Sequence, residues 1–345
     1  MNWNEYGAFI IEETKNLLAI DSPSGMTKKA AEHVAARFEA LGYAPQTTRK
    51  DGVLVCLGGR DRENGLLLEA HMDTLGGMVC QIKANGRLKI TPIGGLRAEN
   101  VEAENCRVVT KFDGVIEGTA QLINASTHVN EKYADTQRTF DTVEIVLDEP
   151  VADAEDVKKL GVRTGDYVCF EPRTRVTQSG YIKSRFLDDK LSVGILLGYA
   201  RYLKDERITP ERAVYVHITS FEEVGHGGSA SVPAGVTEAI SVDMGCVGEG
   251  LTCDERMVSI CAKDSGGPYN YDVVRGLIAA AEKMGAPYAV DVYPRYGSDV
   301  EATLRAGYDL RHGLIGSGVY ASHGYERSHI EGALATLKTL AGYVK

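Results

Sequence analysis

The sequence lacks any hydrophobic run that approaches the roughly 20 apolar residues of a membrane-spanning helix. It also lacks a cluster of lysine and arginine: the formal net charge is -10, whereas nucleic-acid-binding proteins present clustered cations to phosphate groups. Residues 1–20 carry acidic side chains and no basic segment ahead of the apolar ones, unlike a secretory signal. We therefore expect no membrane partner, no nucleic-acid partner and a cytoplasmic location.

Paired cysteines are absent as well. The seven cysteines are an odd number, are scattered along 345 residues and show no Cys-x-x-Cys spacing, so neither a disulfide framework nor a thiolate zinc site is expected. We interpret them as reduced thiols that serve mostly in packing. With 43% hydrophobic and 25% charged residues, the composition is that of a globular protein with a large core and about two domains.

The pattern of elements changes twice along the chain. Helical spacing in residues 1–20 and 28–43, followed by β-type runs at 52–58 and 65–73, predicts an α/β fold. Between residues 77 and 175, short apolar runs are separated by glycines and turns, including the hairpin signal ANGR at 84–87. The α/β pattern then returns. We expect a discontinuous α/β domain of residues 1–76 and 176–345, with residues 77–175 inserted as a small all-β domain.

Acidic and histidine side chains lie at the ends of the predicted α/β elements, which is where open α/β sheets bind ligands. These groups are His71, Asp73, Asp188, Asp189, Glu222, Glu223, Asp243, His323 and His329. Carboxylates with imidazoles suit zinc, cobalt or manganese.

Taken singly, each motif has two interpretations. His71 and Asp73 are two residues apart on a predicted strand and would point the same way, as a metal ligand with its orienting acid or as a core histidine with a structural aspartate. Asp189, directly after Asp188, could be a first-turn acid of the following helix. Glu222 and Glu223 would face opposite directions on an extended segment, so that one could bind a cation and the other reach a water.

Together the motifs AHMDTLGGMV, NGRLKITPIGG, SRFLDDK, FEEVG, VDMG, KDSGGPYNY and YGSDVEA identify a family resemblance. In this order and spacing they are similar to those of the tetrahedral (TET) metalloaminopeptidases, the deblocking or glutamyl aminopeptidases. The resemblance implies a phosphorylase/hydrolase-like three-layer α/β catalytic domain with an inserted small β-barrel, and assembly into a homo-oligomer, a dodecameric shell. It also implies short peptide substrates and two divalent metal ions per chain, zinc or cobalt, with manganese as the third choice.

The resemblance assigns roles by motif. The implied metal ligands are His71, Asp188 as the bridging carboxylate, Glu223, Asp243 and His323. Glu222 is similar to the family's general base, and Asp73 to the acid that holds His71. Residues 297–299 match the glycine-hydroxyl-aspartate block, which we interpret as shaping the site. The segment SHGYERSH departs from the usual His-Ser/Thr-Pro, which leaves His329 as an alternative ligand to His323 and leaves the substrate preference open.

Three other functions compete with the aminopeptidase. The same dimetal site could serve an amidohydrolase or deacylase that acts on an N-blocked small molecule. Two carboxylates could hydrolyse a glycoside, although such sites need neither metals nor histidines. An inactive assembly protein is the third alternative.

Overall fold

The computed structural model describes residues 2–344, which divide into two compact units. One unit comprises the residues up to Thr74 and from Arg173 onward, and the other comprises Leu75–Pro172. The sequence placed these boundaries at 76/77 and 175/176. None of the described helices is long and apolar enough to cross a membrane.

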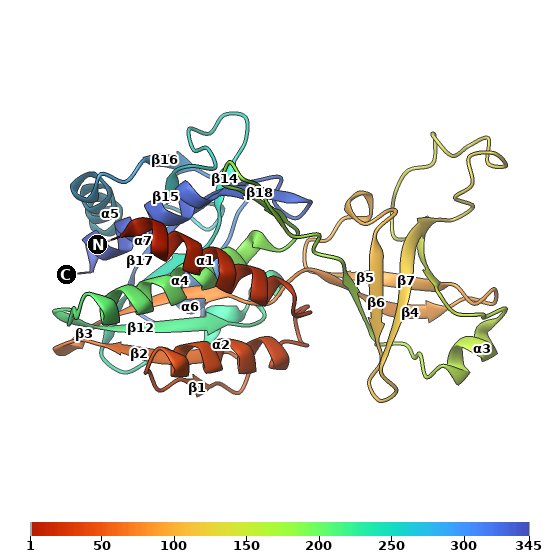
Figure 1. The fold of residues 1–345 in the computed structure, drawn as a ribbon, viewed down its shortest axis with the longest axis horizontal. Coiled ribbons are helices and arrows are strands. Elements are labelled where there is room, and N and C mark those ends of the chain that lie inside the picture. The colour runs from red at the N-terminus through yellow and green to blue at the C-terminus, as the bar shows by residue number, and fades with distance from the viewer. Residues whose placement is uncertain (1, 345) are drawn as a thin grey trace. The chain divides into compact units, whose positions relative to one another are not determined.

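The first unit is built on a mixed sheet (Figure 1). Its helices are α1 (Trp3–Leu18), α2 (Lys28–Ala40), α4 (Leu187–Asp205), α5 (Tyr271–Met284), α6 (Asp299–Arg305) and α7 (Ile330–Tyr343). Its strands are β1 (Gln46–Thr47), β2 (Val53–Gly58), β3 (Asp61–His71), β10 (Arg175–Val176), β11 (Tyr181–Ser184), β12 (Arg212–Thr219), β13 (Val236–Val242), β14 (Gly245–Val247), β15 (Val258–Lys263), β16 (Tyr288–Val292), β17 (Arg311–Tyr320) and β18 (Glu326–His329).

The order of the strands determines where a site can form. The sheet runs β1-β2-β12-β3-β13-β17-β18-β11-β10, with β14, β15 and β16 joined to it beside β17. Strands β12, β3, β13 and β17 pair in parallel, so their carboxyl ends lie along one edge. Open α/β sheets bind ligands at this edge.

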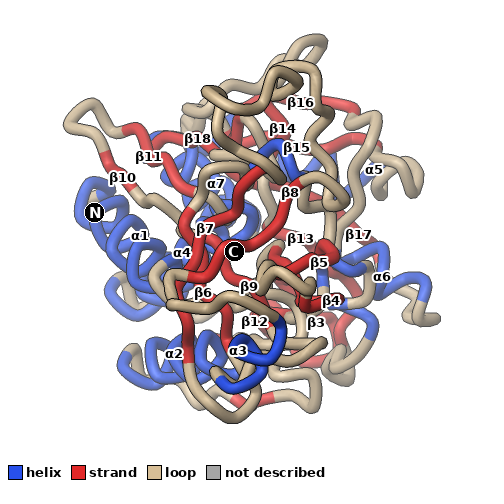
Figure 2. The backbone as a smooth tube through the Cα atoms, turned by 90° about the vertical axis from the view of Figure 1, so that its right-hand side faces the viewer, coloured by secondary structure: helices blue, strands red, loops and turns tan. Residues whose placement is uncertain are grey.

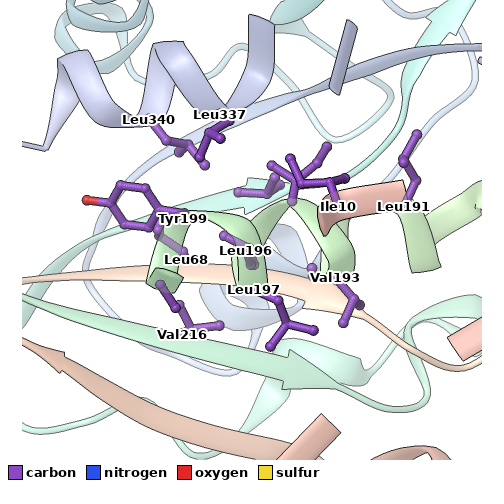
Figure 3. Close-up of a cluster of buried hydrophobic side chains, with 14 of the residues drawn as sticks. Ile10, Leu68, Leu191, Val193, Leu196, Leu197, Tyr199, Val216, Leu337 and Leu340 are labelled. Carbon is purple, nitrogen blue, oxygen red and sulfur yellow. The ribbon is translucent and has the colours of Figure 1, made fainter. Parts of the chain in front are cut away.

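Side chains alternate along the buried strand β3 and separate two hydrophobic layers. Leu66 and Leu68 join a core formed with helices α1, α2, α4, α5 and α7. Leu67 points to the other face, into a smaller cluster with Val300 of α6. Figure 3 shows side chains of α4 between those of the sheet and α7. The first unit therefore has three layers, with the sheet in the middle.

Helix α4 is buried along nearly its whole length because other helices cover it. Gly194 permits the closest approach, since a Cβ atom there would lie 2.3 Å from Oγ1 of Thr14 on α1. Helix α5 is capped at both ends: the Asn270 side chain accepts hydrogen bonds from the first-turn amides, and Gly285 ends the helix with a left-handed backbone.

The inserted unit is a closed barrel of strands in the order β4-β5-β8-β7-β6-β9 (Figure 2). These strands are β4 (Gly76–Ile82), β5 (Leu88–Ile93), β6 (Asn105–Val109), β7 (Val115–Leu122), β8 (Val143–Leu147) and β9 (Tyr167–Phe170), with the short helix α3 (Ala154–Lys159) before β9. Alternate residues of β6 and β7 are buried, as the period of two predicts. The expected α/β fold with an inserted β-barrel is confirmed.

Candidate functional site

The acidic and histidine groups come together at the carboxyl edge of the parallel strands. His71 is the last residue of β3, and Asp243 directly follows β13. Glu222 and Glu223 follow β12, and His323 follows β17. Asp188 lies at the start of α4. Segments far apart in the sequence thus supply one buried cluster.

Three of the contributing segments adopt a left-handed backbone at residues other than glycine. The φ angles are 67° at Phe186, 72° at Phe221 and 62° at His323 itself. Such angles are unfavourable for side-chain-bearing residues and concentrate at functional sites. Asp188 and Asp189, joined by a cis peptide bond, also depart from helical φ and ψ within α4.

Asp188 lies between two histidine rings. Its Oδ1 is 3.1 Å from Nε2 of His71, and its Oδ2 is 3.4 Å from Nε2 of His323. Each carboxylate oxygen therefore faces a different ring, so Asp188 could offer one oxygen to a cation near His71 and the other to a cation near His323.

The adjacent glutamates lie on a 3₁₀ turn, Glu222–Val224, and the expectation of an extended segment is wrong. The left-handed Phe221 ends the extended backbone before the glutamates begin. The two carboxylates still diverge: Oε2 of Glu222 is 3.8 Å from Nε2 of His71, whereas Oε2 of Glu223 is 3.6 Å from Nε2 of His323. Both face the site, but on different sides of it.

Asp73 contacts His71 through its backbone as well as its side chain. The carbonyl oxygen of Asp73 lies 2.9 Å from Nδ1 of His71, while the carboxylate Oδ1 is 3.6 Å away. The carboxylate accepts hydrogen bonds from the backbone N–H groups of Glu222 and Glu223, at 3.2 and 3.4 Å, and from the Ser24 hydroxyl at 2.5 Å. Asp73 therefore holds both His71 and the glutamate turn, and leaves Nε2 of His71 directed into the cluster.

Asp243 and Asp189 complete the side of the cluster next to His71. One ligand atom from each of these three residues lies within 4.8 Å of the others. Asp243 is held by a hydrogen bond from its N–H to the Ile315 carbonyl, at 3.0 Å. Gly316 allows this contact, because a Cβ atom there would lie 1.7 Å from the Asp243 carbonyl oxygen.

Asp189 lies in the first turn of α4, as its place after Asp188 suggested, but it does not have the helical backbone of a regular first-turn acid. It is fully buried, and its Oδ2 accepts a hydrogen bond from the backbone N–H of His71 at 3.2 Å. The non-helical backbone at this residue points the side chain toward the sheet instead of along the helix surface.

His329 lies outside the cluster. Its Nε2 is 2.8 Å from the Ser179 carbonyl oxygen, and its Nδ1 accepts a hydrogen bond from the N–H of Glu331 at the start of α7. With both ring nitrogens engaged there, His329 serves as a helix cap. Of the two candidates, the structure brings His323 to Asp188 and Glu223.

The donor set fits divalent cations. Imidazole nitrogens and carboxylate oxygens form two groups, His71 with Asp189 and Asp243, and His71 with Asp188 and Glu223. Oε1 of Glu223 and Oδ1 of Asp189 are buried without a hydrogen-bond partner. Buried polar atoms are normally paired, so orphaned carboxylate oxygens at this place are what metal ligands would leave.

Electrostatics support the same conclusion. Burial, followed by repulsion from neighbouring carboxylates, raises the pKa of Asp243 to about 7 and raises the pKa values of Glu222 and Glu223 well above their ordinary range. Burial opposes ionisation of Asp188, but the rings of His323 and His71 outweigh it and lower the pKa. Crowded buried carboxylates of this kind favour a bound positive charge.

Sequence reasoning missed one more buried acid, Glu326. Its carboxylate accepts hydrogen bonds from the backbone N–H groups of Asp188 and His323, each at 3.0 Å. Burial and the nearby Asp188 raise its pKa to about 8. The only signal for it was the unusual GYER segment.

Asp299, expected to shape the site, accepts hydrogen bonds from the Thr219 hydroxyl and the N–H of Gly228.

A pocket of about 180 Å³ opens beside Glu222. Helix α6 and the segment before it supply most of the wall, and Arg305 forms an ion pair with Glu301, one turn earlier on α6, with an Nη2–Oε2 distance of 2.6 Å. The lining residues are Glu222, Gly225, Ser265, Gly266, Tyr296, Gly297, Ser298, Asp299, Glu301, Ala302 and Arg305. A ligand in this pocket would lie next to the cluster of carboxylates and histidines.

Comparison with known proteins identifies relatives over the whole chain. The model of the M42 glutamyl aminopeptidase family matches residues 51–339. The putative aminopeptidase YhfE of Bacillus subtilis (strain 168) is 41% identical over 335 residues, which cover 97% of each chain. Among solved structures, an aminopeptidase of the archaeon Desulfurococcus kamchatkensis matches with a TM-score of 0.87 at 21% identity, covering 98% of this chain and 95% of its own. The TET1 peptidase of Pyrococcus horikoshii matches with a TM-score of 0.85 at 22% identity, covering 97% and 99%.

Proposed function

The chain belongs to the M42 glutamyl aminopeptidase family, and we propose that it removes N-terminal residues from short peptides at the buried cluster of carboxylates and histidines. Membership makes it an aminopeptidase, a hydrolase that uses divalent metal ions. We propose that these ions are zinc or cobalt, with manganese as the third choice. The observation that carries the site is Asp188, whose two oxygens face His71 and His323. A deacylase is not favoured, because the relatives are named aminopeptidases.

The residues divide into ligands and a proton carrier. His71 and Asp243 would hold one cation, Glu223 and His323 the other, and Asp188 both. Bound there, divalent cations would polarise the scissile carbonyl and lower the pKa of the attacking water.

Glu222 would take the proton of that water and deliver it to the leaving amine. Its carboxylate lies beside His71, and its backbone N–H is fixed by Asp73 at 3.2 Å. Glu223 has an oxygen without a hydrogen-bond partner, which suits a ligand better than a proton carrier. This division of labour explains why two adjacent glutamates are needed.

The pocket beside Glu222 would take the side chain of the N-terminal residue. Its volume of about 180 Å³ suits one side chain and is below the roughly 300 Å³ at which pockets for drug-sized ligands begin. Ala302 lies in the wall, so Ala302→Leu should fill part of the space. We expect KM to rise for peptides that begin with a large residue and to change little for those that begin with alanine. Equal effects on both peptide sets would argue that the side chain binds elsewhere.

The decisive experiment is hydrolysis of paired peptides, each with a free and an N-acetylated amino terminus. The protein would be reconstituted with zinc, cobalt or manganese, and a chelated sample would be the control. Metal-dependent release of N-terminal residues from the free-amine set supports the proposal. Cleavage of the acetylated set alone would move the assignment to a deacylase, and activity that survives chelation would contradict a metal site.

We also propose that the protein assembles into a homo-oligomer, with the dodecameric shell as the specific form. The support is similarity to the TET1 peptidase of Pyrococcus horikoshii, which assembles into a tetrahedron or a large octahedral shell. Light scattering coupled to size exclusion measures the particle mass directly. A mass equal to the monomer's 37.3 kDa would contradict the proposal.

A further inference from the structure

Glu326 is a buried acid that the mechanism above does not use. It begins β18, which pairs with β11 and with β17, and its side chain is 1% exposed. Burying a carboxylate is costly unless hydrogen bonds compensate, and an apolar residue would fill the same space at lower cost.

The compensation comes from two backbone groups that belong to different parts of the cluster. Oε2 of Glu326 accepts the N–H of Asp188, and Oε1 accepts the N–H of His323, each at 3.0 Å. Asp188 and His323 lie on either side of the same contact, with 3.4 Å between Oδ2 and Nε2. One carboxylate therefore connects the backbones of two residues that are far apart in the sequence.

We infer that Glu326 is a positioning residue that holds the backbones of Asp188 and His323 at the spacing required to bind the second cation. The inference rests on the proposed metal site. Glu326 would not touch the cation or the substrate; it would act through the two residues that it connects.

The two segments need such support. His323 has a φ of 62° within a loop, and its side chain is 39% exposed, so the surrounding core restrains the ring only in part. Asp188 has non-helical φ and ψ at the start of α4, so a regular helical first turn does not fix its backbone. Replacement of a residue that orients a metal ligand through a hydrogen bond typically lowers the metal affinity by about 10- to 100-fold.

The substitution Glu326→Gln tests the inference with minimal change in shape. The amide has one oxygen, so its NH₂ group must face one of the two backbone N–H donors, and one connection is lost. The matched control is Glu39→Gln, the same chemical change at an exposed residue near the end of α2. Glu326→Asp, which keeps the charge but is shorter by one carbon, serves if the glutamine variant does not fold.

The readout is stepwise binding of Co²⁺ to the full-length protein, followed by its visible absorption spectrum and by competition with a chelator. We expect one equivalent of Co²⁺ to bind about 10- to 100-fold less tightly in Glu326→Gln, with an altered spectrum, while the other equivalent changes less and Glu39→Gln matches the unmodified protein. Equal affinities for both equivalents in all proteins would overturn the inference.

A merely structural role is separated by a double-mutant cycle. In a His323→Asn background, adding Glu326→Gln should weaken Co²⁺ binding by less than it does in the unmodified protein, because one of the two residues that it positions is already lost. An additive loss would show that Glu326 acts on the fold in general and would overturn the inference. If the unmodified protein itself bound no Co²⁺, the proposed metal site would be wrong. If it bound two equivalents with affinities that Glu326→Gln does not change, the metal site would stand and only the inference about Glu326 would be wrong.

Discussion

Replacement of Glu222 by glutamine should remove turnover and leave the metal ligands in place. Its carboxylate is beside His71, and the backbone N–H is held by Asp73, so the amide can occupy the same position. A general base typically contributes about 10²- to 10⁴-fold to the rate. At about 1.4 kcal/mol per factor of ten, two to four decades correspond to roughly 3 to 5.5 kcal/mol of transition-state stabilisation.

The assay is kcat for a free-amine peptide at saturating zinc or cobalt, together with metal content measured on the same sample. We expect kcat to fall by about 100-fold or more, with KM changed far less and metal content equal to that of the unmodified protein. A fall of less than tenfold would refute Glu222 as the base. Loss of metal from Glu222→Gln would show that the roles of Glu222 and Glu223 are reversed.

Three further predictions follow from the site and its surroundings. Glu223→Ala should weaken metal binding, measured by competition with a chelator, and a variant with normal metal content and rate would exclude Glu223 as a ligand. His323→Asn should likewise lose one equivalent of metal, whereas His329→Asn should lower the melting temperature without changing metal content; the reverse pattern would identify His329 as the ligand. Burial lowers the pKa of His217 from 6.5 to about 4. Between pH 4 and 6.5 the imidazole therefore binds a proton in the unfolded chain and stays neutral in the folded chain. The contribution of His217 to the stability of the metal-free protein should therefore fall as pH drops from 6.5 to 4, by up to about 1.4 kcal/mol per unit. Urea titrations at several pH values measure it as a difference in the pH dependence of the free energy of unfolding between the unmodified protein and His217→Asn. The absence of such a difference would contradict a neutral His217.

The sequence predicted the fold and the family through patterns that are local. Helical spacing predicted the helices, short apolar runs between glycines and turns predicted the inserted all-β domain, and the acids were found at strand ends where the parallel sheet brings them together. The expected family, fold and aminopeptidase activity are confirmed. His71, Asp188, Glu223 and His323 do meet in the structure, although their roles as ligands stay predictions.

What the sequence did not predict depends on backbone geometry at single residues. The contact between Asp189 and the backbone of His71 was not predicted, because helix patterns do not reveal that φ and ψ of Asp189 are non-helical. The glutamates were expected on an extended segment because the sequence does not indicate that Phe221 has a left-handed φ. Glu326 was overlooked because its partners are backbone amides 138 and three residues away, and backbone donors have no sequence signature.

The position of the ligands also links metal binding to folding. His71 and His323 come from the two chain segments that form the first unit, and the whole inserted barrel lies between His71 and Asp188 in the chain. No short fragment contains the site, so the unfolded chain offers only separate, weak donors. A cation that binds only the folded form stabilises it by about 2.7 kcal/mol at a hundred times its dissociation constant. Metal supply would then govern how long the protein survives proteolysis, in addition to whether it is active.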